Sequence, residues 1–135
     1  MRSHTLARRP RIAAVVALHL VICIVHGAAH DGAYVPLSRA GNLFVFAVIV
    51  AGPLAGLALM WPAARLGGWV VALTMAGSLA FGLVNHFVIA SPDHVMHVVP
   101  QWRPLFGVTA ALLALTEAIG ATLGIRVATE RTYAS

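Results

Sequence analysis

The chain has 135 residues, of which 60% are hydrophobic and only 10% are charged, with a net charge of +5 and a pI of about 11.2. A soluble domain of this size is far less apolar, so the composition excludes a soluble globular protein. The basic residues are all arginines that flank apolar segments, so the charge indicates membrane topology and does not indicate a nucleic-acid partner.

Four apolar stretches are long enough to cross a lipid bilayer, which requires ~20 residues each. They cover about residues 12–29, 43–61, 68–90 and 105–125, and the connections between them are short. We therefore expect one domain over residues 1–135, an all-α integral membrane protein built as a four-transmembrane-helix bundle.

The first predicted helix follows a group of arginines and ends in small residues, a pattern that imitates a secretory signal peptide. Because His19 interrupts its apolar run, we expect this segment to remain as a transmembrane helix. In the second helix, Pro53 removes a backbone hydrogen-bond donor and predicts a kink near the helix centre. Small residues spaced four apart predict close helix contacts in lipid, at Gly52 and Gly56 and again at Gly120 and Gly124.

The arginines are distributed unevenly about the four helices. Seven lie on the side of the termini (Arg2, Arg8, Arg9, Arg11, Arg65, Arg126 and Arg131), and two, Arg39 and Arg103, lie on the other. Cytoplasmic loops are enriched in basic residues, so this asymmetry predicts an inner-membrane protein with both termini in the cytoplasm. The use of arginine without lysine, with abundant Ala, Val and Gly, is typical of a bacterial source.

The two loops on the far side are related by an offset of 64 residues. This offset pairs His30 with His94, Val35 with Val99, Pro36 with Pro100 and Arg39 with Arg103. One interpretation is a duplication that gives two helical hairpins in parallel orientation. The alternative is that proline ends each loop and arginine begins each following helix.

Histidines gather toward the predicted outer end of the bundle. His26 and His30 are one helical turn apart, His86 lies near the outer end of the third helix, and the loop that follows contains Asp93, His94 and His97. Neutral imidazole is a good ligand for copper, iron and zinc, so these six residues are candidate ligands of a transition metal, with copper or iron favoured. The alternative interpretation is that interfacial histidines cap helix ends and bond to loop carbonyls.

A second polar group lies deeper in the predicted membrane. His19 and Glu117 are at similar heights on the first and fourth helices, so we expect a buried pair that is either a structural contact or part of a proton relay. Cys23 lies on the same face of the first helix, and Met96 lies between the loop histidines. These two sulfur residues are candidate soft ligands for copper(I), although each is more often a packing residue.

The HxxxH and HxxH spacings resemble the histidine boxes of membrane di-iron hydroxylases and desaturases, which have more histidines and hold them on the cytoplasmic side. A four-helix membrane cytochrome is the other resemblance, and it implies haem b with His26 and His86 as axial ligands. The sequence thus favours a metal protein for metal handling or redox chemistry, with a b-type haem protein or a non-catalytic subunit of a larger membrane complex as alternatives. Whether the chain is an enzyme or a homo-oligomer stays open at this stage.

Overall fold

The computed structural model describes the backbone of residues 2–130 and the side chains of residues 9–130. Arg131 lies outside the described residues, and the side chains of Arg2 and Arg8 are not described. The helices are α1 (Arg2–Gly32), α2 (Arg39–Phe44), the π-helical segment η1 (Val45–Ala51), α3 (Gly52–Leu59), α4 (Ala64–Leu83), the π-helical segment η2 (Val84–Val88) and α5 (Arg103–Ala128).

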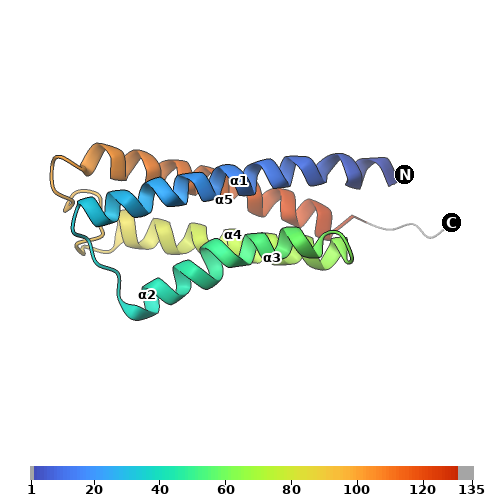
Figure 1. Cartoon of the computed structure of the whole chain (residues 1–135), viewed down its shortest axis with the longest axis horizontal. Coiled ribbons are helices and arrows are strands. Elements are labelled where there is room, and N and C mark those ends of the chain that lie inside the picture. The colour runs from blue at the N-terminus through green and yellow to red at the C-terminus, as the bar shows by residue number, and fades with distance from the viewer. Residues whose placement is uncertain (1, 131–135) are drawn as a thin grey trace.

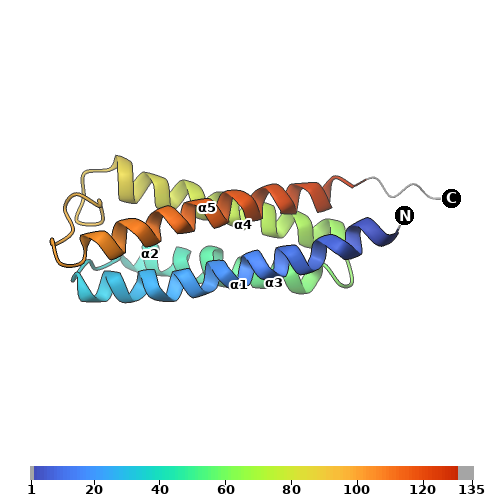
Figure 2. The same cartoon turned by 90° about the horizontal axis from the view of Figure 1, so that it is seen from above.

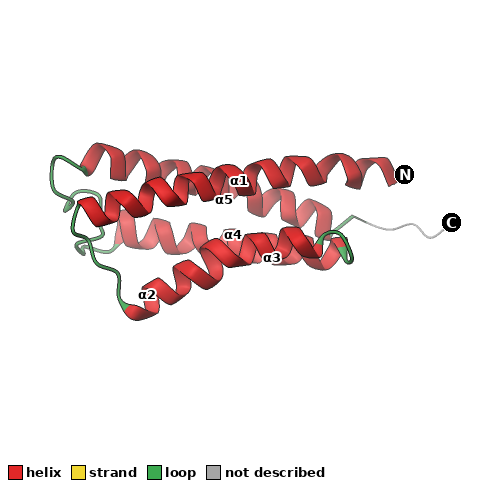
Figure 3. Ribbon diagram, in the orientation of Figure 1, coloured by secondary structure: helices red, strands yellow, loops and turns green. Residues whose placement is uncertain are grey.

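Within the described residues, four helical spans are long and apolar enough to cross a membrane, as the sequence predicted. They are Arg9–Gly32, Arg39–Leu59, Ala64–Val88 and Arg103–Ala128. Figure 1 shows the start of α1 and the end of α5 at one end of the bundle, which we call the terminal end, and the longer loops at the opposite end, which we call the histidine end. All long elements are helical (Figure 3).

The spans do not pack with equal closeness. α5 packs along both α4 and α1, and α3 packs along α4, whereas α1 contacts α3 only slightly and makes few backbone contacts with α2 and η1. In Figure 1 the second span bends, so that α2 diverges from the bundle toward the histidine end, and Figure 2 shows α1 beside α5 along most of its length. The hairpin formed by the first two spans is therefore open at the histidine end.

The bend in the second span lies beside Pro53, where the sequence predicted a kink. The π-helical segment η1 ends directly before Gly52 and Pro53 begin α3. In a regular helix the carbonyl oxygen of Ile49 would accept a hydrogen bond from the N–H of residue 53, which proline lacks. Instead, Nε2 of His19 lies 3.1 Å from that oxygen and donates to it. Pro53 thus leaves the carbonyl oxygen of Ile49 without a donor from its own helix, and His19 of α1 supplies the hydrogen bond instead.

Glycines allow the closest helix contacts, also as predicted from their spacing. A Cβ atom on Gly124 would lie 2.7 Å from the backbone nitrogen of Ala72 and 2.8 Å from the carbonyl oxygen of Gly68. A Cβ atom on Gly56 would lie 2.8 Å from the backbone nitrogen of Val71. α4 therefore contacts both α5 and α3 backbone to backbone, which is how helices gain packing energy in lipid.

Two apolar clusters fill the described interior, and a polar layer separates them. The cluster nearer the terminal end contains Ile12, Val16, Met60, Val71, Met75, Ala121 and Val127. The cluster at the histidine end contains Ala29, Ala33, Val35, Val98 and Phe106. His19 and Glu117 lie in the layer between them and are both buried. The candidate metal ligands lie against the second cluster.

The loop interpretation of the paired arginines receives direct support. Arg39 is the first residue of α2 and Arg103 the first residue of α5. Arg103 donates from Nε and Nη2 to the carbonyl oxygen of Val98, so it fastens the loop to the helix that follows. The duplication of two hairpins stays a prediction.

Candidate metal centre

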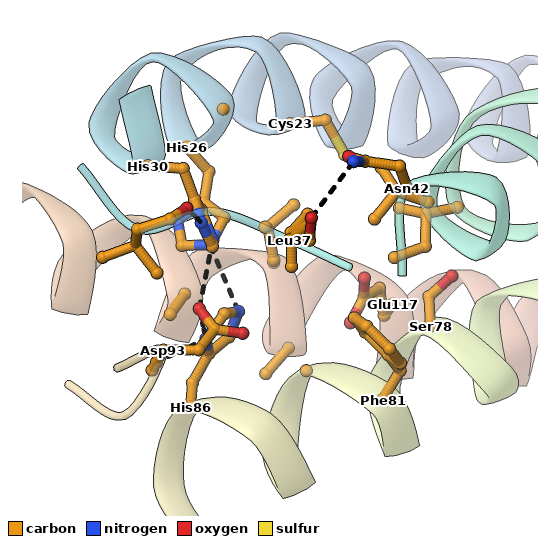
Figure 4. Close-up of a pocket in the computed structure, with 18 of the residues that line it drawn as sticks. Cys23, His26, His30, Leu37, Asn42, Ser78, Phe81, His86, Asp93 and Glu117 are labelled. Carbon is orange, nitrogen blue, oxygen red and sulfur yellow. Dashed lines mark hydrogen bonds and ion pairs between the residues drawn. The ribbon is translucent and has the colours of Figure 1, made fainter. Parts of the chain in front are cut away.

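Three of the predicted ligands meet at the histidine end. His26 and His30 come from the last turns of α1 and His86 comes from η2 (Figure 4). One ligand atom from each lies within 4.8 Å of the others, so His26, His30 and His86 could hold a metal ion. Nε2 of His26 is only 3.2 Å from Nε2 of His86.

The end of α1 is shaped so that His30 is held in place. The helix ends in a Schellman motif, in which the amide of Val35 donates to the carbonyl oxygen of His30 and the amide of Tyr34 donates to that of Asp31. Tyr34 occupies the left-handed position with a φ of 56°, where glycine is the usual residue. The turn brings the carbonyl oxygen of Val35 to 3.2 Å from Nδ1 of His30.

His86 is held by the loop that follows it. The amide of Val95 donates to the carbonyl oxygen of His86, and Nδ1 of His86 donates to the carbonyl oxygen of Asp93 at 3.1 Å. The π-helical turn of η2 is a feature that often occurs at functional sites because it displaces one residue from the regular helical pattern. The loop and the widened turn together orient the imidazole toward α1.

Each imidazole has a hydrogen-bond partner at Nδ1. Nδ1 of His26 lies 2.8 Å from Oγ1 of Thr109, and the ring donates to this hydroxyl when the hydroxyl proton bonds to a carbonyl oxygen of its own helix. Nδ1 of His30 and Nδ1 of His86 both donate to backbone carbonyls, which can only accept. With a proton on each Nδ1, all three neutral imidazoles present a lone pair at Nε2; without a metal ion, a proton on one Nε2 instead links His26 and His86, which lie 3.2 Å apart at these atoms.

Asp93 adds a carboxylate beside the three imidazoles. Its Oδ1 atom lies 3.3 Å from Nε2 of His30 and 3.2 Å from Nδ1 of His86. Burial raises the pKa of the Asp93 carboxyl, but the hydrogen bond from His86 and the positive charge that the three histidines carry when protonated outweigh burial and leave the pKa below its ordinary value of 3.8. An ionised Asp93 facing the lone pair of His30 makes a favourable place for a cation.

Phe106 closes the apolar side of this group. Its ring centre lies 4.7 Å, 4.8 Å and 5.2 Å from those of His26, His30 and His86, and its side chain is fully buried. An apolar wall of this kind excludes water and strengthens electrostatic interactions at the site. No motif or spacing in the sequence associates Phe106 or Thr109 with the histidines.

The two loop histidines lie apart from this group. His94 and His97 pair with each other, with ring centres 5.2 Å apart, and neither belongs to the described set of converging ligand atoms. Nδ1 of His97 donates to the carbonyl oxygen of Ser91, and Nδ1 of His94 accepts from the amide of Met96. This bonding to loop backbone follows the alternative interpretation of interfacial histidines. The structure thus brings together three of the five predicted histidines, with Asp93.

The sulfur residues do not join the group either. Met96 is exposed in the loop, and Cys23 lies beside His19, with Sγ 3.4 Å from Nε2. The predicted pairing of His19 with Glu117 is present, because Nδ1 of His19 is 3.9 Å from Oε1 of Glu117. That separation exceeds a hydrogen bond, and Nδ1 has no other partner among the described residues. A proton relay through this pair stays a prediction.

Comparison with known proteins adds no further constraint. No family model matches the chain, and neither a curated protein nor a solved structure shows significant similarity to it. The arrangement of the three Nε2 atoms, Asp93 and their hydrogen-bond partners therefore carries the functional argument.

Proposed function

We propose that this chain is an integral membrane protein that binds one divalent transition metal ion, copper, iron or zinc, through Nε2 of His26, His30 and His86. The observation that carries the proposal is the convergence of one ligand nitrogen from each of three histidines, whose Nδ1 atoms all face an oxygen atom. Metal-binding histidines almost always have this second hydrogen bond, which fixes the ring and its tautomer.

The spacing of the nitrogens agrees with this assignment. Two imidazole nitrogens bound to one ion at ~2.0–2.1 Å in a tetrahedral site lie about 3.3–3.4 Å apart. The two Nε2 atoms of His26 and His86 are 3.2 Å apart. Two bare lone pairs at this distance repel each other, so either a proton or a metal ion lies between them, and a bound metal ion would replace the proton that links the two rings in the metal-free protein. The widest separation in the set, at most 4.8 Å, needs to close by about 1.5 Å on binding.

The composition of the site favours a divalent ion over copper(I). Three imidazoles and a carboxylate are intermediate to hard ligands, whereas copper(I) prefers the sulfur of cysteine or methionine. Cys23 and Met96 lie outside the set, so the soft ligands considered from the sequence make no contribution to it. Asp93 is the fourth ligand or the orienting partner of His86. The function of the protein is then metal handling or redox chemistry.

The alternative of a haem is disfavoured by the same distances. Two axial nitrogens at ~2.0 Å on either side of one iron are about 4 Å apart with the porphyrin between them. His26 and His86 are closer than this, at 3.2 Å, and His30 and Phe106 pack against both. A porphyrin would have to displace both of these side chains.

The distribution of arginines indicates which end of the bundle faces the cytoplasm. With the terminal end in the cytoplasm, as seven of nine arginines favour, the histidine end faces the extracytoplasmic side. The metal centre would then exchange with ions outside the cell.

Metal analysis tests the proposal directly. Purified protein stripped with a chelator is incubated in turn with Cu²⁺, Zn²⁺ and, without oxygen, Fe²⁺, then desalted and analysed. We expect about one ion per chain for at least one of these metals, and Co²⁺ substitution should give the visible bands of a four-coordinate site. Retention of no metal, or of the same amount in a variant with all three histidines replaced by asparagine, would overturn it. If the triple variant retained the same amount of metal and the protein were purified as part of a larger complex, the alternative of a non-catalytic subunit would be favoured.

Replacing Thr109 with valine should weaken metal binding by ~10-fold or more, because Nδ1–H of His26 loses its acceptor and the ring loses its fixed orientation. Thr116→Val is the matched control. Thr116 is a buried threonine of the same helix whose hydroxyl bonds only to backbone carbonyls. Competition titration with a chromogenic chelator measures both. Equal affinities for the two variants would show that Thr109 does not position His26.

A further inference from the structure

A cavity of about 350 Å³ extends inward from the metal centre. Its walls come from all four spans. The lining includes His86 and Asp93 at one end, Glu117 and Ser78 further in, and apolar residues such as Leu37 and Phe81. This volume falls within the ~300–1,000 Å³ typical of small-molecule sites, which are also mostly apolar with a few polar groups.

The cavity exists because the first two spans do not close against each other. α1 contributes one wall and α2 with η1 contributes the opposite wall, and the backbones of these elements make few contacts. Gly27 lies on the cavity wall and is exposed, and a Cβ atom there would meet no atom within 4 Å. Because Gly27 belongs to the first membrane-spanning helix, a molecule dissolved in the bilayer would reach the cavity at this point.

The inner end of the cavity carries a carboxyl group without a hydrogen-bond partner. Glu117 is 3% exposed, and its carboxyl oxygen Oε1 faces Nδ1 of His19 at 3.9 Å, which is beyond hydrogen-bond distance. Figure 4 shows this side chain in the cavity beside Ser78 and Phe81, on the far side of Leu37 from the histidines. A buried carboxyl is costly without a partner, so this end of the cavity favours a ligand with a hydroxyl group.

The cavity is also elongated. On α5 the lining runs from Ala110 to Glu117, which are seven residues apart, or about 10 Å along a helix. An unbranched chain of octanol length spans this distance. The shape therefore suits a slender apolar molecule with a hydroxyl at one end.

We propose that this cavity binds a lipid-soluble alcohol, which enters between α1 and η1, hydrogen-bonds to Glu117 and extends its apolar chain toward the histidine triad. This site lies beyond the metal-binding function and does not require it. Where the metal is bound, the far end of the ligand lies next to the ion.

Photolabelling tests this proposal in protein reconstituted into lipid vesicles. The probe is an octanol that carries a diazirine, and adducts are located by mass spectrometry. We expect labelling of Glu117 and of the neighbouring cavity wall, and competition by excess octanol. Gly27→Leu and Ala114→Leu should each reduce this labelling by about five-fold or more, because each places a side chain in the cavity.

Matched controls separate cavity filling from other effects. Gly107→Leu makes the same exchange at a glycine with no atom within 4 Å of its Cβ position, and Ala111→Leu makes the second exchange on an exposed face of α5, both away from the cavity. These two control variants should be labelled to the same extent as the unmodified chain. Labelling that does not saturate, or that is equal in the filled and control variants, would overturn the proposal. The same labelling is expected in metal-free protein, so failure of the metal centre and failure of this site are distinguishable.

Discussion

Replacing His86 with asparagine is expected to remove the bound metal while leaving the bundle folded. The amide nitrogen of asparagine occupies roughly the place of Nδ1, so the hydrogen bond to the carbonyl oxygen of Asp93 is kept. Nε2, which converges on His26, is lost. Loss of a ligand should exceed the ~10–100-fold effect of an outer partner, so we expect the dissociation constant to rise more than about 100-fold. Chelator competition and metal analysis measure it.

His97→Asn is the matched control for this prediction. His97 also donates from Nδ1 to a backbone carbonyl, that of Ser91, but its ring lies in the exposed loop outside the converging set. The same substitution should therefore leave metal affinity unchanged. If His97→Asn lost metal and His86→Asn did not, the ion would bind to the loop pair of His94 and His97. Circular dichroism on both variants checks that the helices remain.

The four spans were predictable because lipid imposes a simple rule. Backbone groups in the bilayer have to bond internally, so ~20 apolar residues form a helix regardless of finer detail. The observed spans, such as Arg103–Ala128 for the predicted 105–125, differ from the predictions by only a few residues at each end. The glycine contacts were also predictable, since a missing side chain has the same consequence wherever two helices cross.

The candidate site was only partly predictable. Periodicity placed His26 and His30 on one face, and helix length placed His86 at the same end, because both depend on helical geometry alone. The position of His94 and His97 depends on the path of an irregular loop, which local bonds to Ser91 and to the amide of Met96 decide. No periodic signal encodes such a path.

Other features of the site arise from partners distant in sequence. Thr109 is 83 residues from His26 and looks like any intrahelical threonine in the sequence. The cavity results from the divergence of α2, which depends on η1 and Pro53 together. Proline at the predicted kink was visible in the sequence, but the π-helical turn before it and the bond from His19 to Ile49 were not. A helix can accommodate a proline in several ways, and contacts with neighbouring helices determine which of them occurs.

The largest effect on the fold is expected from Gly124→Leu. The Cβ atom alone would lie 2.7 Å from the backbone nitrogen of Ala72 and 3.0 Å from its Cα atom, and backbone atoms of α4 cannot turn away as a side chain can. One extra methylene in a packed interior costs ~1–3 kcal/mol, and here two helices have to separate, so we expect a loss on the order of 3 kcal/mol or more. Thermal unfolding in detergent, followed by circular dichroism, measures this loss.

Gly107→Leu makes the same exchange on the same helix where no atom lies within 4 Å of the Cβ position, and it should unfold at the temperature of the unmodified chain. The pair also tests how the fold supports the metal centre. α5 carries Phe106 and Thr109 to the histidines, and its packing on α4 fixes its height relative to η2. Gly124→Leu should therefore lose metal as well as stability, whereas Gly107→Leu keeps both. If Gly124→Leu unfolded early yet bound metal with full affinity, the site would depend on α1 and η2 without α5.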